Sequence, residues 1–252
     1  MFLLYVVVVN VVGNTPEGMI RIPFGVYKPL YKDDSLASSI PVQSFFLDAT
    51  PVTNREYLLF VKANPQWKRS SVKRLFADSA YLQHWQSDET LGNNAPEKSP
   101  VVCVSWYAAK AYCAWKGKRL PTVAEWEYVA SVSENTIDGY SDPAFLKRIL
   151  EWYSKPTPHV LPVIKTTSKN MFGVYDMHGL IWEWTSDFNS ILVSGESRGD
   201  TGLERDLFCG SGSLRSSDFK NYAAFMRYAF RGSLSANYTT ASLGFRCAKD
   251  AP

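Results

Sequence analysis

Short runs of apolar and aromatic residues predict the strands of this chain. Residues 19–24 and 43–48 are two such runs, each bounded by Pro, Gly or Asp. Residues 101–104 predict a strand before the central helix, and residues 242–247 predict a buried strand at the end of the chain. Helical patterns lie between these runs without a regular strand–helix–strand rhythm. The pattern therefore favours an α+β fold over a doubly wound sheet.

Helix starts are marked by side chains that can accept a hydrogen bond from the free amides of a first turn. These residues are Thr53, Ser105, Thr122 and Asp142. Thr53 and Thr122 are each followed three residues later by a Glu, which is the spacing of a capping box. Residues 218–231 are compatible with a further helix that ends at Gly232. Because no repeat or linker interrupts the pattern, one loop-rich domain is expected over residues 18–252.

Residues 1–17 contain an apolar, Val-rich run, and no Lys or Arg precedes Arg21. The run is too short to span a bilayer comfortably but suits the hydrophobic region of a signal peptide. It lacks a basic lead-in and a clear cleavage site, and a buried first strand is the alternative, since Val favours sheets. The first interpretation predicts an exported protein, periplasmic or extracellular. No other segment is apolar enough to cross a membrane.

Charge and composition narrow the class of partner. The chain carries 27 basic and 24 acidic residues, a net charge of +3, so no strong field attracts nucleic acid. The densest basic stretch, residues 68–74, lies beside acidic residues and is expected to be a solvated face. Eight Trp, 14 Tyr and 14 Phe accompany 15 Gly and 14 Pro, which indicates irregular segments held in place by large rings.

Three stretches match a known family in its order. The first runs from Val104-Ser-Trp and Ala-Tyr-Cys113 through Gly-Lys-Arg-Leu-Pro-Thr122 to Glu-Trp-Glu-Tyr128. The second joins Phe172-Gly-Val-Tyr-Asp-Met177 to Trp182-Glu-Trp-Thr-Ser-Asp187, and the third is Leu243-Gly-Phe-Arg-Cys-Ala248. Pro51-Val-Thr-Asn54 supports them. The chain resembles the formylglycine-generating-enzyme (sulfatase-modifying-factor) family, whose fold is a variant of the C-type-lectin fold.

The matching residues are expected to be mostly structural. Trp182 and Trp184 lie two apart, so on a strand both rings face one side and Glu183 faces the other. Arg119 is expected to pair with a carboxylate. Helix capping and ion pairing, rather than acid–base catalysis, are expected to account for three acidic residues: Glu125, Glu127 and Asp187.

The resemblance implies a disulfide between Cys113 and Cys247, which would tie the central helix to the last strand. Closing so long a loop would stabilise the fold by about 4 kcal/mol. Such a bond persists in oxidising compartments, in agreement with an exported protein. Two separate buried thiols are the alternative.

Active members of the family carry two cysteines shortly after a Gly-Gly-Ser-like turn. The resemblance implies that these bind copper(I), where oxygen is activated to oxidise a substrate cysteine to formylglycine. Here the matching turn, Gly210-Ser-Gly-Ser213, is followed by no cysteine before Cys247, so copper and this reaction are not expected. Cys209 remains as the catalytic candidate. With Cys103 it could form a disulfide, a metal site or two core thiols.

Family members often read Gly-Asn-x-Trp-Glu-Trp, in which the Asn helps to bind a structural calcium ion. This chain has Leu180 at that position, which offers no side-chain oxygen. Asp176 and Glu183 are the candidates for a residual calcium site. His178 is a candidate ligand too, although a lone His in a loop is more often simply hydrogen-bonded.

Three functional hypotheses follow, and whether the chain is an enzyme stays open. The first is an exported accessory or maturation factor that binds a peptide or protein. Its groove candidates are Arg215, Asp218, Tyr222, Arg227, Trp182 and Trp184. The second is a metal-dependent oxidoreductase that uses Cys209 with Cys103 or His178. The third is a lectin-like module whose surface rings stack on sugars.

Overall fold

Three small sheets organise the fold in the computed structural model, which describes residues 15–29, 39–189 and 219–252. The largest is antiparallel, in the order β1 (Met19–Ile22), β4 (Phe45–Asp48), β7 (Ala248–Asp250), with Met19 opposite Asp48 and Phe45 opposite Asp250. The others are antiparallel β2 (Gly25–Tyr27) with β3 (Ile40–Val42), and parallel β5 (Trp182–Glu183) with β6 (Leu243–Gly244). Both ends of the described chain therefore meet in one sheet.

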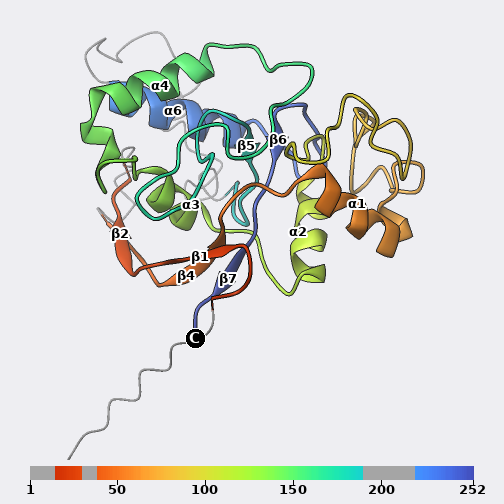
Figure 1. Ribbon diagram of the computed structural model, residues 1–252, viewed down its shortest axis with the longest axis horizontal. Coiled ribbons are helices and arrows are strands. Elements are labelled where there is room, and N and C mark those ends of the chain that lie inside the picture. The colour runs from red at the N-terminus through yellow and green to blue at the C-terminus, as the bar shows by residue number, and fades with distance from the viewer. Residues whose placement is uncertain (1–14, 30–38, 190–218) are drawn as a thin grey trace, which may run out of the picture.

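The helices are α1 (Asn54–Ala63), α2 (Trp106–Trp115), α3 (Val123–Ala130), α4 (Pro143–Tyr153) and α6 (Phe219–Gly232), with 3-10 turns η1 (Pro65–Trp67) and η2 (Gly139–Ser141). Helices α1 to α4 begin directly after the four predicted capping residues. The capping boxes at Thr53 and Thr122 are both formed, and Ser105 and Asp142 also accept amide hydrogen bonds. Figure 1 shows α4 beside α6 at one end of the molecule and α1 beside α2 at the other.

Two strand predictions were wrong. Residues 101–104 form no strand, because the amides of Val101 and Cys103 bond to separate segments, the carbonyls of Val52 and Thr240, and Cys103 has a left-handed φ of 54°. Residues 242–247 do not form one continuous strand either. Of these residues only Leu243 and Gly244 lie in a strand, β6, and β7 begins afterwards at Ala248, since the backbone of Phe245 bonds to Val52 and that of Cys247 to Asp48.

Aromatic rings fill the largest core cluster, which lies between α1, α2 and the end of the chain. Tyr57 stacks on Tyr112 with ring centroids 5.7 Å apart, and Phe245 meets both rings edge-on. Trp184 belongs to the same cluster. A second cluster lies between α3 and the sheet of β1 and β4. No helix of the described residues has both the length and the apolar character needed to cross a membrane.

Candidate functional site

The acidic motif residues have the structural partners that were predicted. The Glu125 carboxylate completes the α3 capping box and pairs with Arg119 through two bonds of 2.7 Å. Asp187 accepts a hydrogen bond from the amide of Val123, the first residue of α3. Capping and ion pairing therefore account for both carboxylates, as predicted, without a role in acid–base catalysis.

Glu127 is the centre of a buried ion network. Its carboxylate accepts bonds of 2.9–3.1 Å from Arg227 and of 2.6 Å from Arg231, and both members of the Glu127–Arg227 pair have 1% of their side-chain surface exposed. Burial alone would raise the pKa of Glu127, but the two guanidinium groups overcome it and hold the pKa at about 2. Placing Arg227 in a binding groove was therefore wrong, because this network buries it.

The other groove candidates do not gather into one surface. Trp184 is fully buried, and its indole N–H donates to the Val104 carbonyl at 2.9 Å, so its assignment to a groove was also wrong. Trp182 is half-buried between the rings of Tyr153 and Phe230, at 4.9 and 4.4 Å. Tyr222 is exposed. The remaining candidates lie outside the described residues: Cys209, Arg215 and Asp218.

The carboxylates proposed for calcium are engaged by protein donors. Asp176 accepts hydrogen bonds from the amides of Lys165 and Thr167 and from the Thr167 hydroxyl, at 2.5–3.0 Å. Glu183 pairs with Arg246 and accepts from the indole of Trp126. Among the described residues, no three His, Cys, Asp or Glu side chains come together as a metal site. Hydrogen bonds and an ion pair within the protein thus engage both Asp176 and Glu183. A residual calcium site stays a prediction, and the described residues provide no set of ligands for it.

His178 is a buried, neutral side chain. Its Nε2 donates to the carbonyl of Ala130 at 2.9 Å, and its ring packs edge-on against Trp126 and Phe145. Burial lowers the pKa of His178 to about 3. The side chain lines a cavity of about 390 Å³ that also includes Arg148. The prediction that His178 is simply a hydrogen-bonded residue is confirmed.

The three described cysteines are free, buried thiols: Cys103, Cys113 and Cys247. Burial raises the pKa of Cys247, and its neighbour Cys113, within hydrogen-bonding reach, raises it further. The structure thus places the predicted pair side by side but reduced, and the disulfide itself stays a prediction. Burial also raises the pKa of Cys103, to about 11, so this thiol is protonated at neutral pH.

Cys103 lines a second cavity, of about 420 Å³, where the start of α1 meets two loops. Its polar lining includes Asn54, Gln83, His84, Asn94, Ser99, Thr157 and His159. Cys103 and His178, the two alternative partners predicted for Cys209, line different cavities, and Cys209 itself lies outside the described residues.

The hydrogen bonds of Asn54 determine which nitrogen of His84 carries the proton. The Asn54 amide NH₂ donates to the carbonyls of Pro96 and Ser99, at 3.1 and 3.2 Å, so its Oδ1 faces the other way. That oxygen can only accept, and it lies 3.0 Å from the indole nitrogen of Trp85 and 3.3 Å from His84 Nε2. His84 Nε2 therefore carries the hydrogen, and Nδ1 is a buried acceptor with no protein partner among the described residues.

The cavity therefore offers neutral hydrogen-bonding groups. Burial lowers the pKa of His84 to about 4, so its ring is uncharged at neutral pH. A protonated thiol beside a neutral imidazole suits binding of a polar group better than nucleophilic attack. Neither Asn54 nor His84 was predicted from the sequence as a site residue. Asn54 ends the Pro51-Val-Thr-Asn54 match, which was a usable signal, whereas His84 lies in no motif.

Comparison with known proteins identifies the family. The sequence model of the sulfatase-modifying factor enzyme 1-like domain matches residues 7–251, nearly the whole chain. The chain belongs to this family. It is 31% identical to the formylglycine-generating enzyme of Streptomyces coelicolor, covering 94% of this chain and 91% of that protein. It is 27% identical to the bovine inactive C-alpha-formylglycine-generating enzyme 2, over 92% of this chain and 86% of that one.

Two further similarities bear on this family member. The serine/threonine-protein kinase Pkn1 of Chlamydia trachomatis is 30% identical over 87% of this chain, which spans only 35% of that protein's length. Among solved structures, Treponema denticola variable protein 1 superposes with a TM-score of 0.51 at 20% identity, covering 92% of this chain and 95% of that one. The latter shows the fold alone. The predicted family and the α+β, formylglycine-generating-enzyme-like fold are confirmed.

Proposed function

We propose that this chain is a divergent, ligand-binding member of its family, an accessory or maturation factor that holds a peptide or protein segment and generates no formylglycine. The proposal rests on the positions and protonation of the cysteine side chains. Of the four cysteines, Cys113 and Cys247 contact each other in the core, and Cys103 is a buried, protonated thiol. Copper(I) chemistry needs a pair of thiolates, and no cysteine follows the Gly210-Ser-Gly-Ser213 turn before Cys247.

The cavity around Asn54 and His84 is the binding site in this proposal. It has room for one or two side chains of a peptide, with Cys103 and the exposed loop at Thr157 and His159 on its wall. Neutral hydrogen-bonding groups would select an uncharged polar side chain, because a charged one would lose hydration without a partner of opposite charge. The similarity to the bovine inactive C-alpha-formylglycine-generating enzyme 2 supports a family member that does not catalyse the reaction.

We also propose that the chain works in an oxidising compartment, as its apolar start and its Cys113–Cys247 pair predict. Neighbouring thiols in the core can close a disulfide there, and closure would add stability that the reduced chain lacks.

The catalytic half of the proposal is tested by loading the full chain with copper(I) and incubating it with a sulfatase-type cysteine peptide. Mass spectrometry and an aldehyde-reactive hydrazide report formylglycine, with the Streptomyces coelicolor enzyme as the positive control. We expect product only in the control. Aldehyde formed by this chain, and lost in Cys209→Ser, would overturn the proposal in favour of shifted thiol chemistry.

The binding half is tested by selecting peptides against the immobilised full chain from a random display library. Thr157→Trp places a large ring on the exposed rim of the cavity, whereas Val163→Trp adds the same ring to an exposed position outside its lining. We expect Thr157→Trp to weaken a selected peptide by about tenfold or more and Val163→Trp to leave it unchanged. Failure to enrich any peptide, or equal binding by both variants, would argue against this site.

A further inference from the structure

The basic excess of the chain is concentrated in one region. Residues 54–116 contain nine basic and five acidic residues, whereas the whole chain contains 27 and 24. The rest of the chain thus has no positive excess. These residues form α1, η1, α2 and the loops between them, which lie together at one end of the molecule (Figure 1).

The acidic residues of this region already have partners. Glu56 closes the α1 capping box, Asp78 accepts from Thr239, and Asp88 accepts from Ser70. The other two pair with bases, Glu89 with Lys68 and Glu97 with Arg55. By contrast, seven exposed basic residues of this region have no ion pair within the described part of the chain: Lys62, Arg69, Lys73, Arg74, Lys98, Lys110 and Lys116. The surface of this region therefore carries positive charges that no acidic side chain neutralises within the described part of the chain.

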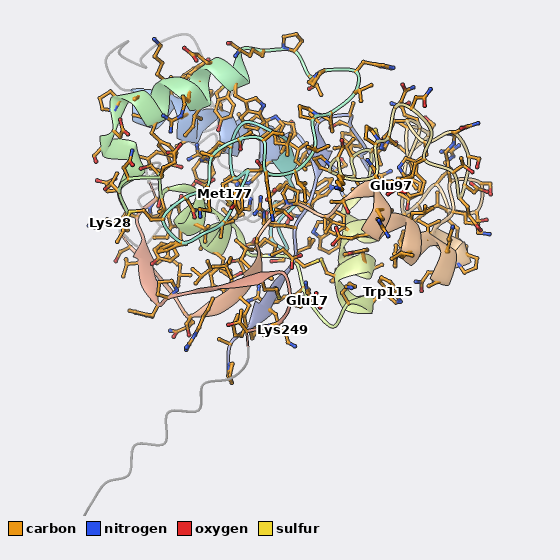
Figure 2. The ribbon with its side chains drawn as sticks, viewed as in Figure 1. Glu17, Lys28, Glu97, Trp115, Met177 and Lys249 are labelled. Carbon is orange, nitrogen blue, oxygen red and sulfur yellow. The ribbon has the colours of Figure 1, made fainter. Side chains whose placement is uncertain are left out.

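Large apolar side chains are exposed among these cations. Trp115 on α2 is 43% exposed, and Leu59 on α1 is 57% exposed. In the loop after η1, Leu75 and Phe76 are 72% and 36% exposed. Figure 2 shows Trp115 on the side of the molecule opposite Lys28.

A continuous row of rings joins Trp115 to Phe76 and Tyr107. Trp115 meets Phe60 at 5.7 Å, Phe60 meets Trp67 at 6.3 Å, and Trp67 meets Phe76 at 6.2 Å. Phe76 then contacts Tyr107 at 5.4 Å. Lys116 lies over the Trp115 ring at 5.6 Å, so a cation and a ring share one surface. Tyr107 and Trp115 stand on one side of α2, since they are eight residues apart.

We propose that this aromatic–basic face, formed by Leu75, Phe76, Trp115, Lys73, Arg74 and Lys116, binds an acidic peptide segment of a partner protein that also carries apolar side chains. Carboxylates of the segment pair with the free cations, and its apolar side chains cover the exposed Leu and aromatic side chains. The most exposed apolar side chain of the face is the aliphatic Leu75, which matches a peptide side chain better than a stacked base. The face is separate from the cavity lined by His84 and stands independently of the function proposed for it.

The test measures binding of a fluorescently labelled peptide that repeats Glu-Phe-Asp-Leu to the full chain by anisotropy. A peptide repeating Lys-Phe-Lys-Leu, a single-stranded oligothymidylate and phosphatidylserine vesicles serve as competing probes. We expect saturable binding of the acidic peptide that weakens with salt, because exposed charges are screened. Tighter binding of the oligonucleotide or of the vesicles would overturn the proposal in favour of those partners.

Variants locate the face. The double change Lys73→Glu with Arg74→Glu should weaken the acidic peptide by about tenfold or more, and Leu75→Ser should weaken it without altering the salt dependence. Lys28→Glu, an exposed cation on the opposite side, is the matched charge control and should bind as the unmodified chain does. All of these positions are exposed, so folding is preserved. No saturable binding, or equal weakening by Lys28→Glu, would contradict the proposal.

Discussion

Glu183 and Arg246 form a buried, bidentate ion pair that joins two of the family's motifs. The guanidinium Nε lies 2.8 Å from Oε2 and Nη2 lies 2.9 Å from Oε1, and neither side chain is exposed to solvent. Glu183 belongs to the Trp-Glu-Trp motif and Arg246 to the closing Leu-Gly-Phe-Arg motif, 63 residues later. Arg246 also donates to the carbonyls of Asp48 and Tyr175, so four segments meet at this pair.

We expect Arg246→Met to destabilise the fold by about 3–5 kcal/mol, because it leaves the Glu183 carboxylate buried without its partner. Urea unfolding monitored by tryptophan fluorescence measures the change. Arg21→Met, at an exposed position, is the control and should cost less than about 0.5 kcal/mol. The double variant Glu183→Leu with Arg246→Met should regain part of the loss, since it removes the unpaired charge. A cost for Arg246→Met equal to that of the control would refute the structural role of the pair.

The stability of the chain should fall as the solution is acidified from pH 6.5. His178 has a folded-state pKa of about 3, below its ordinary value of 6.5, so only the unfolded chain gains the proton in this interval. The stabilisation is therefore complete above pH 6.5 and is lost as the pH falls toward 3, on the order of 5 kcal/mol in all. Urea unfolding at a series of pH values measures the slope.

His178→Gln supplies the matched variant for this slope, because its side-chain amide can still donate to the Ala130 carbonyl but cannot be protonated. The pH dependence should become shallower in His178→Gln, with the remaining slope in this interval coming in part from His84, whose pKa is about 4. An unchanged slope in His178→Gln would show that the imidazole is not buried as described.

Oxidation should stabilise the chain through Cys113 and Cys247. Closing their disulfide should add about 4 kcal/mol, because it restricts the unfolded chain across a long loop. Thermal unfolding with and without a glutathione redox buffer, together with a count of free thiols, measures the effect. Cys113→Ser should abolish the increase, whereas Cys103→Ser should retain it. Oxidation that consumes no thiol of this pair would contradict the prediction.

Gly244 should not tolerate a larger side chain. A Cβ atom built there would lie 2.3 Å from the carbonyl oxygen of Val101, a backbone atom that cannot move aside cheaply. We expect Gly244→Ala to destabilise the fold by about 1–3 kcal/mol or more. Gly117→Ala is a useful comparison, because that Cβ meets nothing within 4 Å and only the φ of 65° opposes it, at a cost of about 1 kcal/mol. A smaller loss for Gly244→Ala than for Gly117→Ala would contradict the close approach.

The amino-acid sequence by itself determined the local features of this protein. Thr53 and Thr122 predicted helix starts correctly, because a capping box depends on residues only three apart. Arg119 was expected to pair with a carboxylate and does so with Glu125, six residues away. The order of the motifs was also enough to identify the family and, with it, the α+β fold.

Only the tertiary structure decided which side chains are exposed and which share a cavity. Arg227 is charged and follows the glycine-serine turn, yet it is buried, because its partner Glu127 lies 100 residues earlier. The left-handed backbone of Cys103 and its place beside His84 depend equally on contacts with distant segments. Burial is a property of packing between such segments, and neither hydrophobic periodicity nor residue spacing records it.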